Sequence, residues 1–68
     1  MYRIIYFNTQ TGYRKFDSDN YDLIAEEHMN LKKHGCKIIC IVDYHANVVL
    51  NKCIDFKAHV HEVNHLVN

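Results

Sequence analysis

One stretch of this sequence resembles a catalytic motif. Residues 59–65 (HVHEVNH) contain His61, Glu62 and His65 in the pattern His-Glu-x-x-His. On a helix, two histidines four residues apart share a face and can bind one zinc ion, while the glutamate acts as general base on a metal-bound water. A zinc protease of this type takes a third protein ligand from further along the chain, and three residues follow His65 here. The sequence therefore predicts no catalytic residues and no cofactor.

The apolar residues around this motif indicate which way its histidines point. Four of them recur at helical spacing: Phe56, Val60, Val63 and Val67. This stripe predicts a helix that buries the valines and leaves His61 and His65 on the exposed face. An exposed pair at this spacing can chelate zinc, nickel or copper, with His59 or a histidine of a second chain completing the shell. A zinc site at His61 and His65 is thus one alternative function.

Three cysteines offer a second kind of chemistry. Cys36 and Cys40 would lie about 13 Å apart along an extended strand, too far for one metal ion to bridge. An odd number of cysteines fits poorly with a disulfide framework, and the N-terminal residues MYRIIYFN lack the pattern of a secretory signal. No apolar run approaches the roughly 20 residues that cross a bilayer. We expect reduced, buried thiols in a cytoplasmic protein that does not bind membranes.

Aromatic and basic residues gather near the N-terminus, where Tyr13, Arg14 and Lys15 could stack on bases and contact phosphates. This pattern gives a second alternative function, a small nucleic-acid-binding protein. It is not favoured, because eight Lys and Arg balance eight Asp and Glu, and no ribonucleoprotein motif is present. The same positions equally suit the protection of a sheet edge.

The order of predicted elements defines the fold class. Four strands and two helices are expected in the order Tyr2–Asn8, Tyr13–Phe16, helix Asn20–His34, Cys36–Tyr44, Val48–Cys53, and a shorter C-terminal helix capped by Asp55. Gly12, Gly35 and Asn47 stand where turns need a positive φ. Residues 38–42 are apolar on both faces, as in a central strand covered on both sides. We predict one α+β domain over residues 1–68, with a mostly antiparallel sheet whose strand order is open.

A large apolar fraction, 49%, in a chain of 68 residues without an assembled active site favours a non-enzymatic protein-protein interaction module. Such a module would be a homodimer or a stoichiometric inhibitor of a larger protein. Aromatic residues near turns are the expected anchors: Tyr13, Tyr44 and His45. An acidic group on the main helix could engage a basic groove of the partner: Asp19, Asp22 and Glu26.

The composition resembles that of small proteins carried by phages and mobile elements of AT-rich hosts. The chain is rich in Asn, Lys and Tyr and contains no Pro or Trp. This resemblance is one of composition and assigns no residues. It implies an inhibitor that binds and blocks a host or defence protein.

Overall fold

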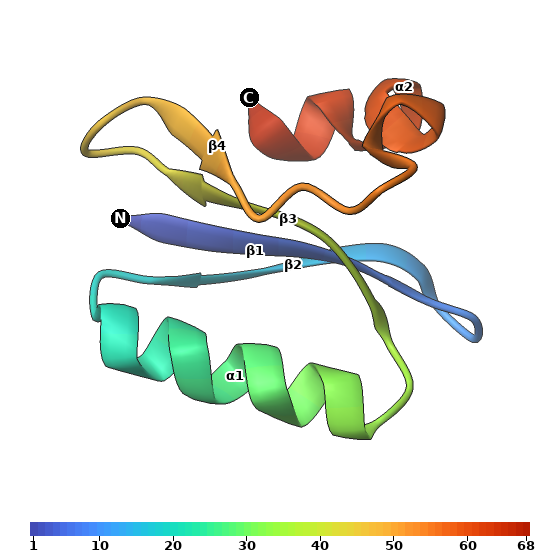
Figure 1. Ribbon diagram of the computed structural model, residues 1–68, viewed down its shortest axis with the longest axis horizontal. Coiled ribbons are helices and arrows are strands. Elements are labelled where there is room, and N and C mark those ends of the chain that lie inside the picture. Colours follow the sequence, from blue (N-terminus) through green and yellow to red (C-terminus); the bar gives the residue numbers. More distant parts are fainter.

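A four-stranded antiparallel sheet forms the middle layer of the protein, with one helix on each face (Figure 1). The computed structural model describes residues 1–68. Its elements are β1 (Tyr2–Asn8), β2 (Gly12–Ser18), α1 (Tyr21–Lys33), β3 (Lys37–Asp43), β4 (Val48–Leu50) and α2 (Phe56–Val67). All strand pairs are antiparallel, so the predicted α+β order is confirmed.

The strand order, which the sequence left open, is β2-β1-β3-β4. Both β2 and β3 run antiparallel to β1, so they are parallel to each other and β1 lies between them. The connection from β2 to β3 passes over β1 and lays α1 across one face of the sheet. After β4 the chain returns over the other face as α2 (Figure 1). No helix is long and apolar enough to span a membrane.

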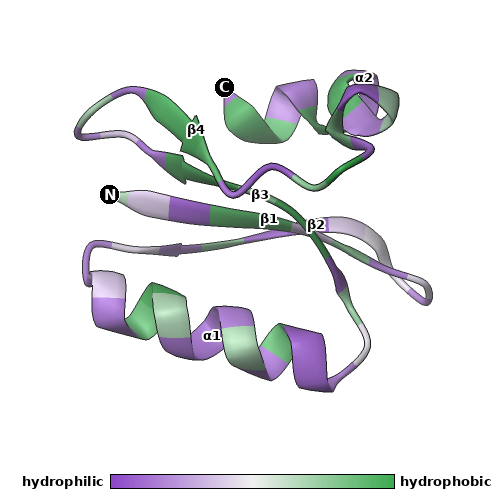
Figure 2. Cartoon of the chain, in the orientation of Figure 1, coloured by the Kyte–Doolittle hydropathy of each residue, from purple (hydrophilic) through white to green (hydrophobic).

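Two small clusters of buried side chains hold these layers together. The α1 side buries Ile4, Ile24 and Ile41. The α2 side buries Ile5, Ile39, Cys40, Val42 and Val63. Neighbouring residues of β1 and β3 therefore enter opposite clusters, as the two apolar faces of residues 38–42 predicted. Figure 2 shows the hydrophobic residues concentrated in the central part of the sheet, between the two helices. A register shift between Ile5 and Tyr6 leaves Ile39 without a partner in β1 and turns it toward α2 together with Cys40.

The predicted turns and the main helix are confirmed in detail. Gly12, Gly35 and Asn47 all have positive φ, at 85°, 79° and 55°. Asn20 caps α1 by accepting a hydrogen bond from the backbone N–H of Asp22.

The last strand is shorter than predicted. It ends at Leu50 and not at Cys53, because Asn51 adopts a φ of 50° and turns the chain out of the sheet. Cys53 therefore lies in the loop before α2, where its N–H donates to the carbonyl of Ile39.

The predicted apolar stripe of α2 is wrong at one position. Val60 is 41% exposed, whereas Val63 is fully buried. The helix is rotated so that His59, and not Val60, lies against the sheet. The ring of His59 is held there by Tyr13 of β2, a contact between distant parts of the chain that helical spacing alone does not register.

Candidate functional site

Five polar side chains meet where α2 begins. Tyr13 comes from β2, Lys37 from the start of β3, Cys53 and Asp55 from the loop before α2, and His59 from the first turn of the helix. Lys37, Cys53 and Asp55 were not predicted as site residues from the sequence, and His59 was predicted only as a possible additional ligand for a metal bound by His61 and His65. The sequence did contain one indication of this cluster. Asp55 and His59 are four residues apart at the start of a helix, a spacing at which two side chains can meet.

Asp55 is the centre of this cluster. Its Oδ2 lies 2.6 Å from Lys37 Nζ and 3.1 Å from His59 Nε2. The Lys37 ammonium, then the Cys53 thiol and then His59 hold the pKa of this carboxyl far below its usual range. Asp55 occupies the N-cap position of α2, yet its side chain caps no backbone N–H. The carboxylate thus serves neighbouring side chains instead of the helix.

His59 is fixed through both ring nitrogens. Nδ1 lies 2.7 Å from the hydroxyl of Tyr13, and Nε2 faces Asp55. The Tyr13 ring also packs edge-on against His59 and against Phe7 of β1. The imidazole is therefore oriented by a hydrogen bond on one side and by aromatic packing, and its tautomer depends on its two partners.

The cluster does not have the properties of a cysteine nucleophile. Burial, followed by the neighbouring Asp55 carboxylate, raises the pKa of the Cys53 thiol, whereas a reactive cysteine needs a lowered pKa. His59 is engaged with Tyr13 and Asp55 and makes no hydrogen bond to the thiol. Burial also raises the pKa of Cys40 to about 11. A thiol, a carboxylate and an imidazole within 4.8 Å of one another are instead a set of metal-binding donors.

The motif histidines lie elsewhere on α2. His61 and His65 are both exposed, as predicted, and neither side chain makes a hydrogen bond or ion pair within the chain. A zinc site formed by these two residues stays a prediction.

All three predicted partner anchors make contacts within the chain. Tyr13 is half-buried against His59, as described above. The half-buried Tyr44 donates its hydroxyl proton to the carbonyl of Val67 and also accepts a hydrogen bond from Arg3. His45 is exposed at the turn between β3 and β4.

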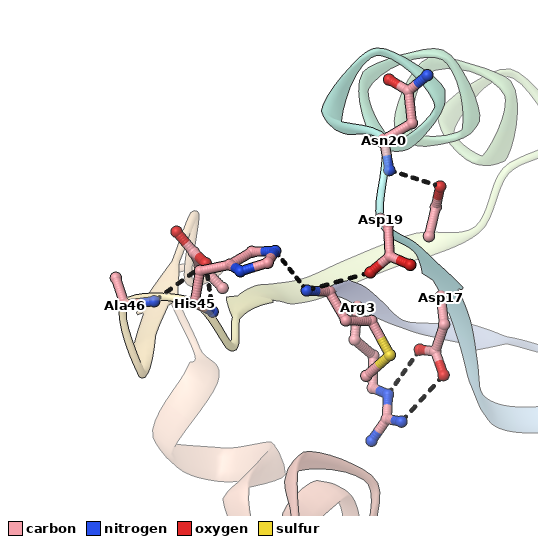
Figure 3. A network of polar contacts seen from close by, with 9 residues as sticks. Arg3, Asp17, Asp19, Asn20, His45 and Ala46 are labelled. Atoms are coloured by element: carbon pink, nitrogen blue, oxygen red, sulfur yellow. Dashed lines mark hydrogen bonds and ion pairs between the residues drawn. The ribbon is translucent and has the colours of Figure 1, made fainter.

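Figure 3 shows the polar contacts at this end of the sheet. His45 Nε2 lies 2.6 Å from the backbone nitrogen of Met1, which is 3.3 Å from a carboxylate oxygen of Asp19. Below them, Arg3 forms two parallel hydrogen bonds with Asp17, of 2.6 and 2.9 Å (Figure 3). The other two acidic residues predicted to contact a partner, Asp22 and Glu26, are exposed on α1.

The basic residues of the first hairpin do not share a face. In the register of β1 and β2, Arg14 lies opposite Tyr6 and Lys15 lies opposite Ile5, so the two side chains point to opposite sides of the sheet. Both helices contact β1 and β2. A helix therefore lies over each face of this part of the sheet, unlike the open face of single-stranded RNA-binding sheets, and nucleic-acid binding through Tyr13, Arg14 and Lys15 stays a prediction.

One surface hollow, of about 270 Å³, lies between the β1–β2 turn and the end of α1. Six residues line it: Asn8, Thr9, Gln10, His34, Gly35 and Cys36. Its two titratable side chains are not hydrogen-bonded to each other, since His34 contacts the carbonyl of Asn30 and the Cys36 thiol contacts Asn8. The hollow therefore contains no paired acid, base or nucleophile.

Comparison of the chain with protein-family models, curated proteins and solved structures gave no significant match. Function is accordingly inferred from the residues and their geometry.

Proposed function

We propose that this protein is a non-enzymatic protein-binding module that acts as a homodimer, with two copies joined edge to edge through β4. The main support is the contrast between the two outer strands of the sheet. The outer strand β2 carries three charged residues, Arg14, Lys15 and Asp17. Charges of this kind keep a sheet edge from recruiting further strands. The outer strand β4 consists of three apolar residues, Val48, Val49 and Leu50, and has no such protection.

The α1 side of β4 is also uncovered. The backbone of β4 lies next to β3 and away from both helices, and only Val49 packs on the buried cluster of the α2 side. Val48 and Leu50 pair with Asp43 and Ile41 of β3, and they are 42% and 37% exposed. Because Ile41 faces α1, the side chain of Leu50 next to it lies on the same side of the sheet. The unpaired edge of β4 and the exposed apolar side chains beside it can therefore contact the same partner.

Two-fold pairing of β4 with itself is chemically self-complementary. A two-fold axis makes the strands antiparallel, and an axis through Val49 places Val48 opposite Leu50 of the partner subunit. All cross-strand pairs are then apolar, and no like charges meet. The chain has no net charge to oppose self-association.

The strand is short, so flanking side chains must contribute. An interface of ordinary size covers about 800 Å² of each partner, or about a sixth of the 4632 Å² surface of this chain. The half-exposed Tyr21 of α1 is one candidate, because its ring packs on Tyr2, which packs in turn on His45 at the β3–β4 turn. A three-residue strand pair suits a weak dimer whose population depends on protein concentration.

We further propose that the dimer acts as a stoichiometric inhibitor of a larger protein. A dimer presents each of its remaining surfaces twice, and two linked sites bind a repeated or dimeric target more tightly than one site does. The exposed acidic residues of α1 are the part of the surface that suits a basic target. Affinity capture with dimeric protein and with a monomeric variant, compared side by side, tests whether a target requires the dimer.

Charged substitutions in β4 test the dimer directly. Val48→Glu and Leu50→Lys each place a charge opposite an apolar residue, and we expect either variant to be monomeric at concentrations where the unchanged protein dimerises. Sedimentation equilibrium at several concentrations measures this. Met29→Lys, on an exposed α1 residue, is the matched control and should dimerise normally.

Mixing the two β4 variants tests the register. In a heterodimer the glutamate introduced at position 48 faces the lysine introduced at position 50 of the partner, so the 1:1 mixture should recover dimer that neither variant forms alone. Dimerisation by both single variants, or a monomer at all concentrations for the unchanged protein, would contradict pairing through β4.

A further inference from the structure

We propose that Cys53, Asp55 and His59 form a binding site for a zinc ion, a property independent of the proposed dimer. The three residues offer one thiolate sulfur, one carboxylate oxygen and one imidazole nitrogen, and these atoms lie within 4.8 Å of one another. Zinc takes all three kinds of ligand in proteins.

The distances fit a tetrahedral ion with small adjustments. From the bond lengths zinc makes to N, O and S, a tetrahedral site separates its nitrogen and oxygen ligands by about 3.4 Å, and separates sulfur from either by about 3.6 Å. His59 Nε2 and Asp55 Oδ2 are 3.1 Å apart, close to that separation. The third donor, the sulfur of Cys53, lies within 4.8 Å of both of these atoms and must approach them by about 1 Å at most.

Tyr13 provides the outer contact that a zinc-binding histidine requires. Histidines that bind a metal through one ring nitrogen almost always hydrogen-bond through the other, which fixes the ring. The hydroxyl of Tyr13 lies 2.7 Å from His59 Nδ1. A phenol can donate to this nitrogen or accept from it, so His59 can switch to the tautomer that leaves Nε2 free for the metal while Tyr13 keeps its place.

The three ligands are also held by one short segment of fixed backbone. Residues 53–59 include all of them. The N–H of Cys53 donates to Ile39 of β3, and the carbonyl of Cys53 accepts from the N–H of Phe56, so the sulfur and the start of α2 are positioned together. Asp55 and His59 are one helical turn apart on the same side of α2. Little conformational freedom is left to be lost when an ion binds.

The carboxylate of Asp55 already forms an ion pair with the side chain of Lys37. The ammonium of Lys37 lies 2.6 Å from Asp55 Oδ2, and the Lys37 side chain is 43% exposed. A zinc ion would displace Lys37 into solvent and take its place at Asp55, while the thiol proton of Cys53 is released to water. With three protein ligands, water would complete the shell, the pattern of zinc sites that keep one open position.

Titration of the purified, tag-free protein with Zn²⁺, and with Co²⁺ as a spectroscopic probe, tests the site. We expect one tightly bound ion per chain, and for Co²⁺ an intense thiolate-to-metal charge-transfer band. Cys53→Ser should abolish that band, and His59→Gln should weaken zinc binding more than Tyr13→Phe does. Loss of an outer partner such as Tyr13 typically weakens binding about 10- to 100-fold.

Two further variants keep the result unambiguous. Lys37→Gln removes the competing ammonium at an exposed position and should tighten zinc binding about two- to fivefold, the scale of an exposed ion pair. Misfolding cannot produce that increase. The double variant His61→Ala, His65→Ala is the control for the exposed pair and should bind zinc as the unchanged protein does. Binding lost in this double variant but kept in Cys53→Ser, or no binding by folded protein at all, would overturn the assignment.

Discussion

Replacing Arg3 by methionine is expected to lower the free energy of unfolding by about 2–3 kcal/mol. A 68-residue domain has a total stability of about 3–10 kcal/mol, so this single change removes a large share of it. The reason lies in the number of partners that one side chain satisfies. The guanidinium donates to both carboxylate oxygens of Asp17, to the carbonyl of Leu66 and to the hydroxyl of Tyr44.

These three partners come from three different parts of the chain, so Arg3 of β1 connects β2, the end of β3 and α2. Asp17 lies in β2, Tyr44 follows β3, and Leu66 lies in the last turn of α2. The side chain of Arg3 is only 12% exposed, and water does not easily replace it. The last turn of α2 would lose its anchor to the sheet, and faster amide hydrogen exchange there should accompany the loss of stability.

Arg14→Met is the matched control for this effect. Arg14 is exposed on β2 and its side chain makes no hydrogen bond or ion pair within the chain, so its replacement should change stability by no more than about 0.5 kcal/mol. Urea denaturation of the two variants provides the measurement. Equal midpoints for the two variants would show that the Arg3 contacts do not stabilise the fold.

The Arg3 effect should also depend on pH in a defined direction. The paired guanidinium lowers the pKa of Asp17 from its ordinary value of 3.8. A carboxyl whose pKa is lowered by folding stabilises the fold fully above its unfolded pKa, and that contribution is lost as the pH falls through the folded value. The stability difference between the unchanged protein and Arg3→Met should therefore shrink below about pH 4. A constant difference from neutral to acidic pH would exclude the Asp17 pair as its source.

The role of Arg3 illustrates what the sequence could not predict. The order of the strands along the chain, α1 and the turns at Gly12, Gly35 and Asn47 follow from local patterns and were predicted correctly, whereas the last strand is shorter than predicted. Arg3 lies 63 residues from Leu66, and no local pattern connects them. Its contacts depend on the strand order and on the side of the sheet that α2 covers, neither of which local spacing determines.

The candidate metal site could not be predicted from local patterns either, because it depends on which face of α2 is buried. Phe56 and Val63 are common to two possible buried faces of α2, one that adds Val60 and one that adds His59. Hydropathy favours valine, but the contact with Tyr13 turns His59 toward the sheet. A rotation of the helix by less than half a turn thus decides which histidine has fixed neighbours. The conspicuous pair, His61 and His65, is left exposed on the other side.

Ile24→Ala is expected to be the most destabilising single substitution in α1, at about 3 kcal/mol. Ile24 is the one fully buried residue of this helix and packs between Ile4 of β1 and Ile41 of β3. Truncation leaves a cavity that the stiff neighbouring strands cannot fill, and the better helix propensity of alanine offsets only a few tenths of a kcal/mol.

The neighbouring residue Leu23 provides the matched control for Ile24→Ala, because Leu23 is 48% exposed whereas Ile24 is fully buried. Leu23→Ala removes a similar number of atoms from the same helix and should cost less than about 1 kcal/mol. Urea unfolding of both variants, with the slope of the transition unchanged, measures the two costs. A large difference between these neighbouring positions would show that the face of α1 carrying Ile24, with the half-buried Leu31 beside the same cluster, holds the helix on the sheet. Similar costs for the two variants would instead mean that α1 packs differently on the sheet.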